Sequence, residues 1–184
     1  MRVLGIAGSL RRDSHNSALL RAAAERLPAG AELVVFERLA EIPPYDEDVE
    51  VAGVPPAANE LRAAIREADA VLIATPEYNH SIPGQLKNAL DWASRPAGES
   101  ALNGKPAATI GASTGMFGAV WAQAELRKVL GAMGGRVLEA ELPVSHATDL
   151  RRGDRLELPP EQAAHMEQIL AELVAATERE PVAA

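Results

Sequence analysis

The sequence predicts a three-layer α/β domain, with helices covering both faces of a parallel β-sheet. Three observations lead to this prediction. Short apolar runs alternate with longer segments of helical periodicity along the chain. Several of the short runs are apolar throughout, which is typical of strands buried on both faces. The length of 184 residues corresponds to a single domain, at about 150 residues per domain.

Five segments are predicted to form strands because they are short, rich in apolar residues and in several cases bounded by turn residues. The third of them reads Ala-Val-Leu-Ile-Ala, with no polar residue to mark a solvent-facing side. The five predicted strands span residues 3–7, 32–36, 70–74, 107–111 and 136–142.

Five helices are predicted where apolar residues recur every three or four positions. Gly30 suits the position just past the first helix, Pro83 suits the first turn of the third, and Gly134-Gly135 ends the fourth. The apolar faces consist of Leu19, Ala23 and Leu27; Leu61, Ala64, Ile65 and Ala68; Leu86, Ala89, Leu90 and Ala93; Ala122, Leu126, Val129, Leu130 and Met133; and Met166, Ile169, Leu170 and Leu173.

The remaining segments are predicted to be irregular. Residues 39–56 are rich in proline and acidic residues and lack periodicity, so we expect a long loop there. We expect one domain over residues 1–178 and a frayed tail over 179–184. Five strand–helix units in a chain of this length fit a flavodoxin-like fold with strand order 2-1-3-4-5.

The composition excludes several classes of function. With 18 basic and 26 acidic residues the net charge is −8, which argues against a nucleic-acid partner. The absence of cysteine excludes disulfides, iron–sulfur clusters and thiol catalysis, and the four histidines lack metal-site spacing. No apolar run approaches the roughly 18 residues of a membrane helix, and the opening segment is too short for a signal peptide. We therefore expect a cytoplasmic protein without a membrane partner.

Ligands of such sheets bind at the carboxyl ends of the strands, so the loops after strands one, three and four are the candidate site. The first loop, residues 8–17, places three hydroxyls, an amide and two guanidinium groups where a helix begins. A helix N-terminus attracts phosphate, and Arg11 could add a bidentate contact. The alternative is helix capping alone, by Ser14 or Asn16. Neither a Walker loop nor a G-x-G-x-x-G fingerprint occurs in this loop.

The second loop, residues 75–84, is bracketed by two prolines, so its backbone is stiff and could hold N–H groups in place. Tyr78 could lie against a flat ring. The alternative is a rigid turn with a polar surface.

The third loop, residues 111–118, contains three glycines that allow a ligand to approach the backbone closely. It also spells G-x-S-x-G around Ser113, the nucleophile motif of serine hydrolases. Too few strands and no HGGG-like oxyanion segment argue against a hydrolase.

Taken together, these loops resemble the NADPH-dependent FMN reductase family, which includes quinone, chromate and azo-dye reductases with a flavodoxin-like fold. The resemblance runs from residue 3 to about residue 140. It rests on Gly8-Ser9-Leu10-Arg11 with Ser14 and Asn16, on Pro76-Glu77-Tyr78-Asn79 with Ser81-Ile82-Pro83-Gly84, on Leu86-Lys87-Asn88-Ala89-Leu90-Asp91-Trp92 with Ser94-Arg95, and on Leu102-Asn103-Gly104-Lys105-Pro106.

The resemblance implies which residues bind FMN. The first loop holds the phosphate, the second follows the edge of the isoalloxazine ring, and the third lies on the ring's other side. The residues implied are Ser9, Arg11, Ser14, Asn16 and Ser17 with the main chain around His15, then Pro76, Glu77, Tyr78 and Asn79, and finally Ser113.

It also implies an oxidoreductase that takes electrons from NADPH or NADH and passes them through FMN to a small acceptor by ping-pong kinetics. The acceptor would be a quinone, free FMN, chromate or an azo compound, and no side chain would act as an acid, base or nucleophile. A homodimer or homotetramer is expected through helices beside the flavin, which carry Trp92 and Trp121.

The alternative is a flavodoxin-like electron carrier, whose acidic charge would suit docking to a redox partner. Carriers usually sandwich the flavin between aromatics, however, and only Tyr78 is clearly available.

Overall fold

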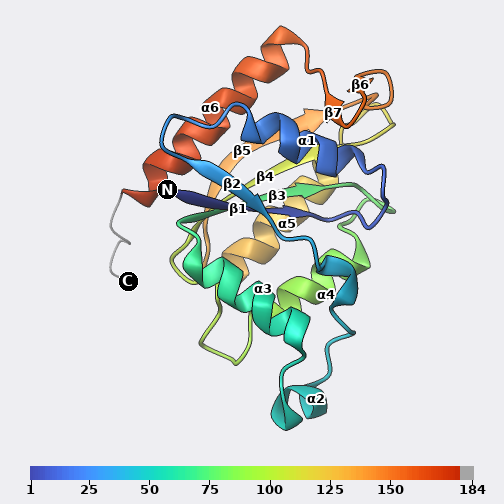
Figure 1. The fold of residues 1–184 in the computed structure, drawn as a ribbon. Helices are drawn as coiled ribbons and strands as arrows, with labels where there is room; N and C mark the ends of the chain where they lie inside the picture. The colour runs from blue at the N-terminus through green and yellow to red at the C-terminus, as the bar shows by residue number, and fades with distance from the viewer. Residues whose placement is uncertain (179–184) are drawn as a thin grey trace.

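The computed structural model describes residues 1–178, so the tail predicted over 179–184 lies outside the described residues. Its centre is a sheet of five parallel strands in the order β2-β1-β3-β4-β5, which confirms the predicted flavodoxin-like fold (Figure 1). The strands are β1 (Arg2–Ala7), β2 (Glu32–Val35), β3 (Ala70–Thr75), β4 (Pro106–Ala112) and β5 (Arg136–Val144).

Helices form a layer on each side of this sheet (Figure 1). One layer contains α1 (His15–Ala24) and α6 (Pro160–Thr177), and the other contains α3 (Pro56–Glu67), α4 (Gly84–Ala93) and α5 (Val120–Ala132). The short elements are the 3₁₀ turn η1 (Leu39–Glu41), α2 (Glu47–Ala52) and a small hairpin of β6 (Arg151–Arg152) and β7 (Arg155–Leu156). Within the described residues, no helix combines the length and apolar character needed to cross a bilayer.

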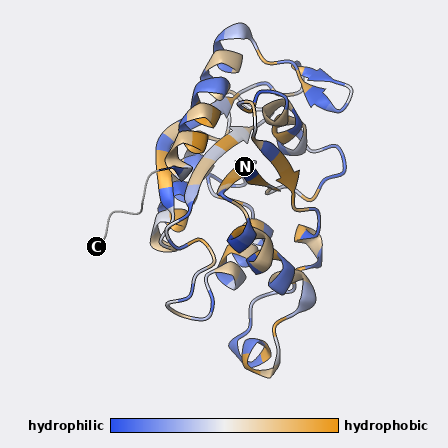
Figure 2. Ribbon diagram, turned by 60° about the vertical axis from the view of Figure 1, so that its left-hand side comes forward, coloured by the Kyte–Doolittle hydropathy of each residue, from blue (hydrophilic) through white to orange (hydrophobic). Residues whose placement is uncertain are grey.

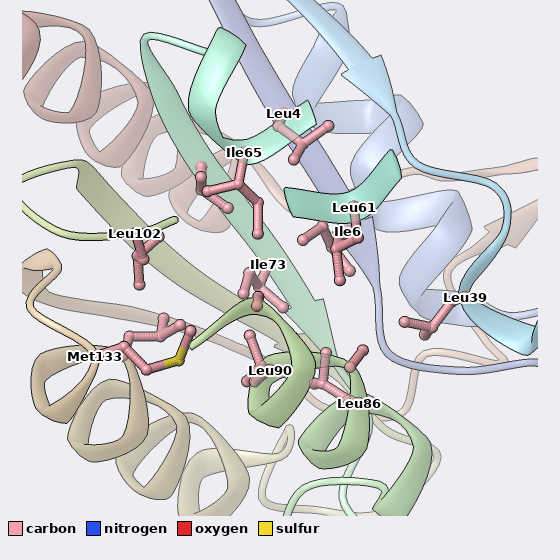
Figure 3. Packing of buried hydrophobic residues seen from close by; sticks show 14 of the residues in the cluster. Leu4, Ile6, Leu39, Leu61, Ile65, Ile73, Leu86, Leu90, Leu102 and Met133 are labelled. Carbon is pink, nitrogen blue, oxygen red and sulfur yellow. The ribbon is translucent and has the colours of Figure 1, made fainter. Parts of the chain in front are cut away.

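Two hydrophobic clusters, one on each face of the sheet, form the core. Alternate residues of a strand enter opposite clusters, as the pleat requires: Ile73 packs with α3 and α4, whereas Leu72 packs with α1 and α6. Figure 3 shows part of the cluster that contains Ile73. In Figure 2 the central strands carry much of the hydrophobic colour, whereas the hairpin of β6 and β7 is hydrophilic. All six residues of β3 are buried, which explains why its sequence shows no alternation.

The carboxyl ends of the central strands lie level with one another. Ala7 pairs with Ala74, and Thr75 pairs with Gly111. The N–H of Gly8 donates to the carbonyl of Ala74 at 2.8 Å, which extends the pairing one residue beyond β1. The loops that follow β1, β3 and β4 therefore begin beside one another, at the edge where the sequence predicts the site.

The segment predicted as a loop over residues 39–56 contains η1 and α2, so that prediction was wrong in part. The structure gives α2 an N-cap, because the N–H of Asp48 donates to the carboxylate of Asp46 at 2.8 Å. None of its residues is buried, so the sequence carries no apolar periodicity to reveal it. The helix projects from the body of the molecule (Figure 1).

The first helix also ends earlier than predicted. It stops at Ala24, and Gly30 lies in a separate turn, with a φ of 87°. Pro28 accounts for the difference, since proline disfavours helical backbone in the residue before it. The β6–β7 hairpin was not predicted, because its strands are only two residues long and mostly arginine.

Arg62 on α3 fastens the α2 segment to the core. Its guanidinium is buried, with Nε donating to the carbonyl of Trp92 at 2.8 Å and Nη2 to the carboxylate of Glu50 at 3.3 Å. The Glu50 side chain is only 15% exposed, so the pair is largely desolvated.

We predict that Arg62→Ala lowers the free energy of unfolding by about 3 kcal/mol, because it removes the positively charged partner of a largely buried carboxylate, which would keep its hydrogen bond from the Tyr45 hydroxyl. Urea denaturation measures this change. Arg66→Ala is the control, since that exposed arginine lies one turn further along α3 and makes only a 3.5 Å contact with the carbonyl of Glu99. Equal losses in the two variants would contradict the prediction.

Candidate functional site

A cleft of about 110 Å³ lies at the carboxyl edge of the sheet, between the loops that follow β1, β3 and β4. It brings together most of the predicted site residues from three separate parts of the sequence. Those in its lining are Ser9, Arg11, Ser14, His15, Asn16, Pro76, Glu77, Tyr78 and Ser113, joined by Ala112 and Thr114, which were not predicted.

Ser14 caps the helix that begins in the first loop. Its Oγ accepts hydrogen bonds from the N–H groups of Asn16 at 3.1 Å and Ser17 at 3.2 Å, so Ser14, one of the two residues expected to cap this helix, is its N-cap. Ser17 itself lines a neighbouring cavity of about 310 Å³, between the first loop and the end of β2. It does not appear in the lining of the cleft.

Asn16 joins the first loop to the third. Its Nδ2 donates to the carbonyl of Ala112 at 2.9 Å, and its Oδ1 accepts from the N–H of Ala112 at 2.9 Å. Both polar ends of the buried amide therefore bind the end of β4. The side chain fixes the distance between two walls of the cleft, a role that neither the phosphate-binding nor the capping interpretation anticipated.

The first loop is suited to an anion. The opening turn of α1 contains no acidic residue, so its positive dipole end is not offset there. Arg11 lines the cleft, and the Nδ1 of His15 is buried without a hydrogen-bond partner. Burial lowers the pKa of His15 below its ordinary 6.5, and the positive charges of Arg151 and Arg11 lower it further. An anion bound here would offset these charges.

The second loop is a tight hairpin. Tyr78 and Ser81 exchange two backbone hydrogen bonds, at 2.9 and 3.1 Å, and the residues between them, Asn79 and His80, have φ values of 54° and 62°. These are features of a type I′ turn. Asn79 lies at its tip and is absent from the lining of the cleft, whereas Tyr78 lies at its base with 48% of its surface exposed.

Glu77 links this loop to the helix that follows the third loop. Its Oε2 accepts from the N–H groups of Trp121 at 3.1 Å and Ala122 at 3.2 Å, in the first turn of α5. The residue at the N-cap of that helix, Ala119, has no side-chain oxygen to offer. The Glu77 carboxylate therefore caps α5 from another loop, and its negative charge is attracted to the positive end of the helix dipole.

The third loop offers no nucleophile–base pair around Ser113. The Ser113 Oγ donates to the carbonyl of Gly115 at 3.4 Å. The His146 main-chain N–H binds the same carbonyl at 3.1 Å, and the ring of His165 contacts the carbonyl of Glu141 at 3.0 Å. This geometry gives the serine-hydrolase alternative no support.

An exposed hydrophobic patch borders the cleft on the side of α5. We define it as the exposed side chains of Tyr78, Met116, Phe117 and Trp121 on the second loop, the third loop and the start of α5. The Trp121 ring links these segments, because it meets Phe117 edge to face at 4.7 Å and His80 at 4.9 Å. Trp92, by contrast, is fully buried and donates from Nε1 to the carbonyl of Pro43 at 2.9 Å. Of the two tryptophans expected near a subunit interface, Trp121 is therefore the one that a partner subunit could contact.

Sequence reasoning missed one basic residue near the site. Arg151 lines a wider cavity of about 510 Å³ that adjoins the cleft and shares Arg11, His15 and Thr114 with it. The available signal was the Arg151-Arg152 pair in an acidic chain. Among the residues that the structure describes, no group of three or more His, Asp or Glu side chains could hold a metal ion.

Residues 1–149 match the family model for NADPH-dependent FMN reductases. The chain is 52% identical to the NAD(P)H-dependent FMN reductase of Pseudomonas aeruginosa over 130 residues, covering 71% of this chain and 69% of that protein. It is 41% identical to the quinone reductase of Escherichia coli K12 over 131 residues, with the same two coverages. A flavoenzyme from Paracoccus denitrificans, an NAD(P)H:acceptor oxidoreductase, has a similar structure, with a TM-score of 0.85 and 32% identity over 98% of this chain and 99% of that one. The span matched by the family model includes all three loops of the cleft.

We predict that His15 is neutral at pH 7 and titrates below pH 6.5, because burial and two arginines disfavour its charged form. Between this lowered pKa and 6.5, the unfolded chain binds a proton that the folded chain does not. The free energy of unfolding should therefore fall as the pH falls through that window. Adding inorganic phosphate should raise the pKa, since an anion favours the imidazolium.

An NMR titration of the histidine ring protons measures both effects, with His15→Gln identifying the resonance and removing its share of the pH-dependent stability. A midpoint at or above 6.5 without phosphate would contradict the prediction, as would a midpoint that phosphate leaves unchanged.

Proposed function

This chain belongs to the NADPH-dependent FMN reductase family, and we propose that it oxidises NAD(P)H and passes the electrons through bound FMN to a quinone. Membership makes it an oxidoreductase that uses FMN and a nicotinamide cofactor. The observation that supports the proposal most directly is the cleft, in which Arg11, the N-terminus of α1 and the half-exposed Tyr78 lie together at the edge of the sheet. One end of the cleft suits a phosphate and the other suits a flat ring.

The donor set of the cleft fits FMN. The Arg11 guanidinium and the Ser9 hydroxyl would bind the phosphate, with the orphaned Nδ1 of His15 beside them. Tyr78 and the backbone of residues 76–79 would line one side of the isoalloxazine ring, and Ser113 and Thr114 the other. Asn16 and Glu77 would act through the backbone, because their side chains hold the loops in place.

When FMN is bound, it would supply the redox chemistry, namely transfer of a hydride and of electrons between the nicotinamide and the acceptor. The chain's own groups would bind and orient. The N–H groups of Tyr78 and Ser113 are used within the protein, on the carbonyls of Ser81 and Val144 at 2.9 and 3.0 Å. Main-chain donors to the ring would therefore come from other residues of these two loops.

Ping-pong kinetics follow from a shared binding face. The cleft is open beside Tyr78, so the nicotinamide and the acceptor would occupy the same exposed surface in turn. Relatives named quinone reductase support a quinone as the acceptor. Free FMN, chromate and azo compounds are the other acceptors to assay.

We also propose that the protein is a homodimer that buries Met116, Phe117 and Trp121 of this patch and leaves Tyr78 exposed beside the cleft. An apolar patch rich in aromatic residues is the kind of surface that forms the centre of a subunit interface. With Tyr78 outside the interface, the ring end of the site would stay open to the nicotinamide and the acceptor.

The proposed FMN binding can be tested by visible spectroscopy. Protein supplemented with FMN and then desalted should retain a visible flavin band, which NADPH or NADH should bleach without oxygen and a quinone should restore. Arg11→Ala should weaken FMN binding about 10- to 100-fold, because it removes a charge-assisted contact with the phosphate. Arg12→Ala, with the same loss of charge at an exposed neighbour outside the cleft lining, is the matched control.

Each contrary result has its own meaning. A band that neither nicotinamide bleaches would replace the reductase with an electron carrier. A protein that retains no flavin would contradict the proposal of bound FMN.

The proposed homodimer can be tested by measuring the molar mass. Trp121→Glu should reduce the molar mass found by light scattering from that of a dimer toward that of a monomer, since it places a charge in the proposed interface. Val51→Glu is the control, because Val51 is 84% exposed on α2, away from the patch. An unchanged mass for Trp121→Glu would refute the proposed interface.

A further inference from the structure

The β6–β7 hairpin packs against α1, near the N-terminus of the chain. It lies outside the region that the family model matches, which ends at residue 149. It lies beside α1, as Figure 1 shows. The side chain of Leu156 is buried in the core, and Arg155 forms an ion pair with Glu25. In the other direction, Nη1 of Arg21 on α1 donates to the carbonyl of Asp154 at 3.0 Å. The hairpin is therefore fastened to α1 on several sides.

Arg151 extends this attachment to the first loop of the cleft. Its Nη1 donates to the carbonyls of Asp13 at 3.3 Å and Ser14 at 3.1 Å. Its Nε donates to the carbonyl of Gly153 at 2.7 Å, within the hairpin. A single half-buried guanidinium thus binds both the hairpin and the two residues that precede α1.

These bonds contribute to the direction in which the loop's N–H groups point, together with the N–H of Ala18, which donates to the same Ser14 carbonyl at 3.1 Å. In a planar trans peptide the C=O and the N–H of the next residue point in opposite directions. Holding the Ser14 carbonyl therefore aims the N–H of His15 away from Arg151. Holding the Asp13 carbonyl fixes the N–H of Ser14 in the same way, and that group donates to the carbonyl of Arg11 at 3.2 Å. The backbone around Arg11, Ser14 and His15 is thereby set from one side.

Arg151 also adds charge at this place. With Arg11 and His15 it lines the cavity of about 510 Å³ that adjoins the cleft, and Asp13 is the one acidic residue among the described residues of that lining. The positive charge of Arg151 contributes to the lowered pKa of His15, which is consistent with the proximity of the two groups. In a chain of net charge −8, this is a local concentration of positive charge.

We propose that Arg151 is a positioning residue of the phosphate site: it orients the backbone of residues 13–15 so that the protein distinguishes FMN from riboflavin. This inference rests on the function proposed above. Riboflavin carries the same ring but lacks the phosphate, so the ratio of the two affinities isolates the phosphate site from the ring site.

The test uses the full-length apoprotein and measures the dissociation constants of FMN and riboflavin by quenching of flavin fluorescence. Arg151→Gln should weaken FMN binding about tenfold and change riboflavin binding less than about twofold, because only the phosphate depends on the loop. Arg151→Lys keeps the charge but lacks the fork that reaches two carbonyls, so it should recover only part of the lost affinity. Arg152→Gln is the matched control, since that side chain pairs with Glu157 and the carbonyl of Asp149 inside its own segment.

The outcomes separate the two proposals. A wild-type protein that binds riboflavin as tightly as FMN would refute the proposed phosphate site, and with it the proposed basis of FMN binding. A wild-type preference for FMN that Arg151→Gln leaves intact would overturn only the inference about Arg151. The inference would also be overturned if Arg151→Gln lowered the affinity for both flavins equally and lowered the melting temperature, since Arg151 would then stabilise the whole fold. If Arg151→Gln fails to fold, Arg151→Lys decides, and a wild-type affinity ratio in that variant would overturn the proposal.

Discussion

The burial of β3 on both faces is the constraint from which the rest of this structure follows. Because all six of its residues are enclosed between the helix layers, no polar group can face solvent from the middle of the sheet. Chemistry is confined to the carboxyl edge, where the backbone leaves the sheet. The level pairing of Ala7 with Ala74, and of Thr75 with Gly111, then brings three loops to one place.

The sheet brings these loops together, but side chains set the distances between them. Asn16 binds the first loop to the end of β4, Glu77 binds the second loop to α5, and Arg151 binds the first loop to the hairpin. In each case a polar side chain spans two segments far apart in the sequence and satisfies backbone groups at its far end. The cleft is therefore lined by backbone that is already fixed, which reduces the entropy cost of binding a ligand.

The strand order was predicted correctly, because burial leaves a periodic signal in the sequence. The candidate site was predicted at the carboxyl edge from topology alone, and the structure has a cleft there. Prediction failed where the periodic signal is absent. None of the residues of α2 is buried, so no apolar periodicity marked that helix. The end of α1 was predicted from Gly30, but the helix ends earlier, at Ala24, because Pro28 follows. Within the site, position along a loop did not reveal that Asn79 would lie at the tip of a hairpin. Arg151 escaped notice because its contact lies 137 residues away and belongs to no motif.

The bridge formed by Asn16 also bears on how the protein ages. Asparagine followed by serine is prone to deamidation: the backbone nitrogen of the next residue attacks the side-chain carbonyl carbon, ammonia leaves, and water then opens the succinimide ring to a carboxylate. Here the Ser17 nitrogen is held by the cap from Ser14, and the Asn16 amide is held at both ends by Ala112. Ring closure would require breaking all of these bonds together. The interaction that shapes the cleft thus also protects it from a slow covalent change that would place a negative charge beside the phosphate loop.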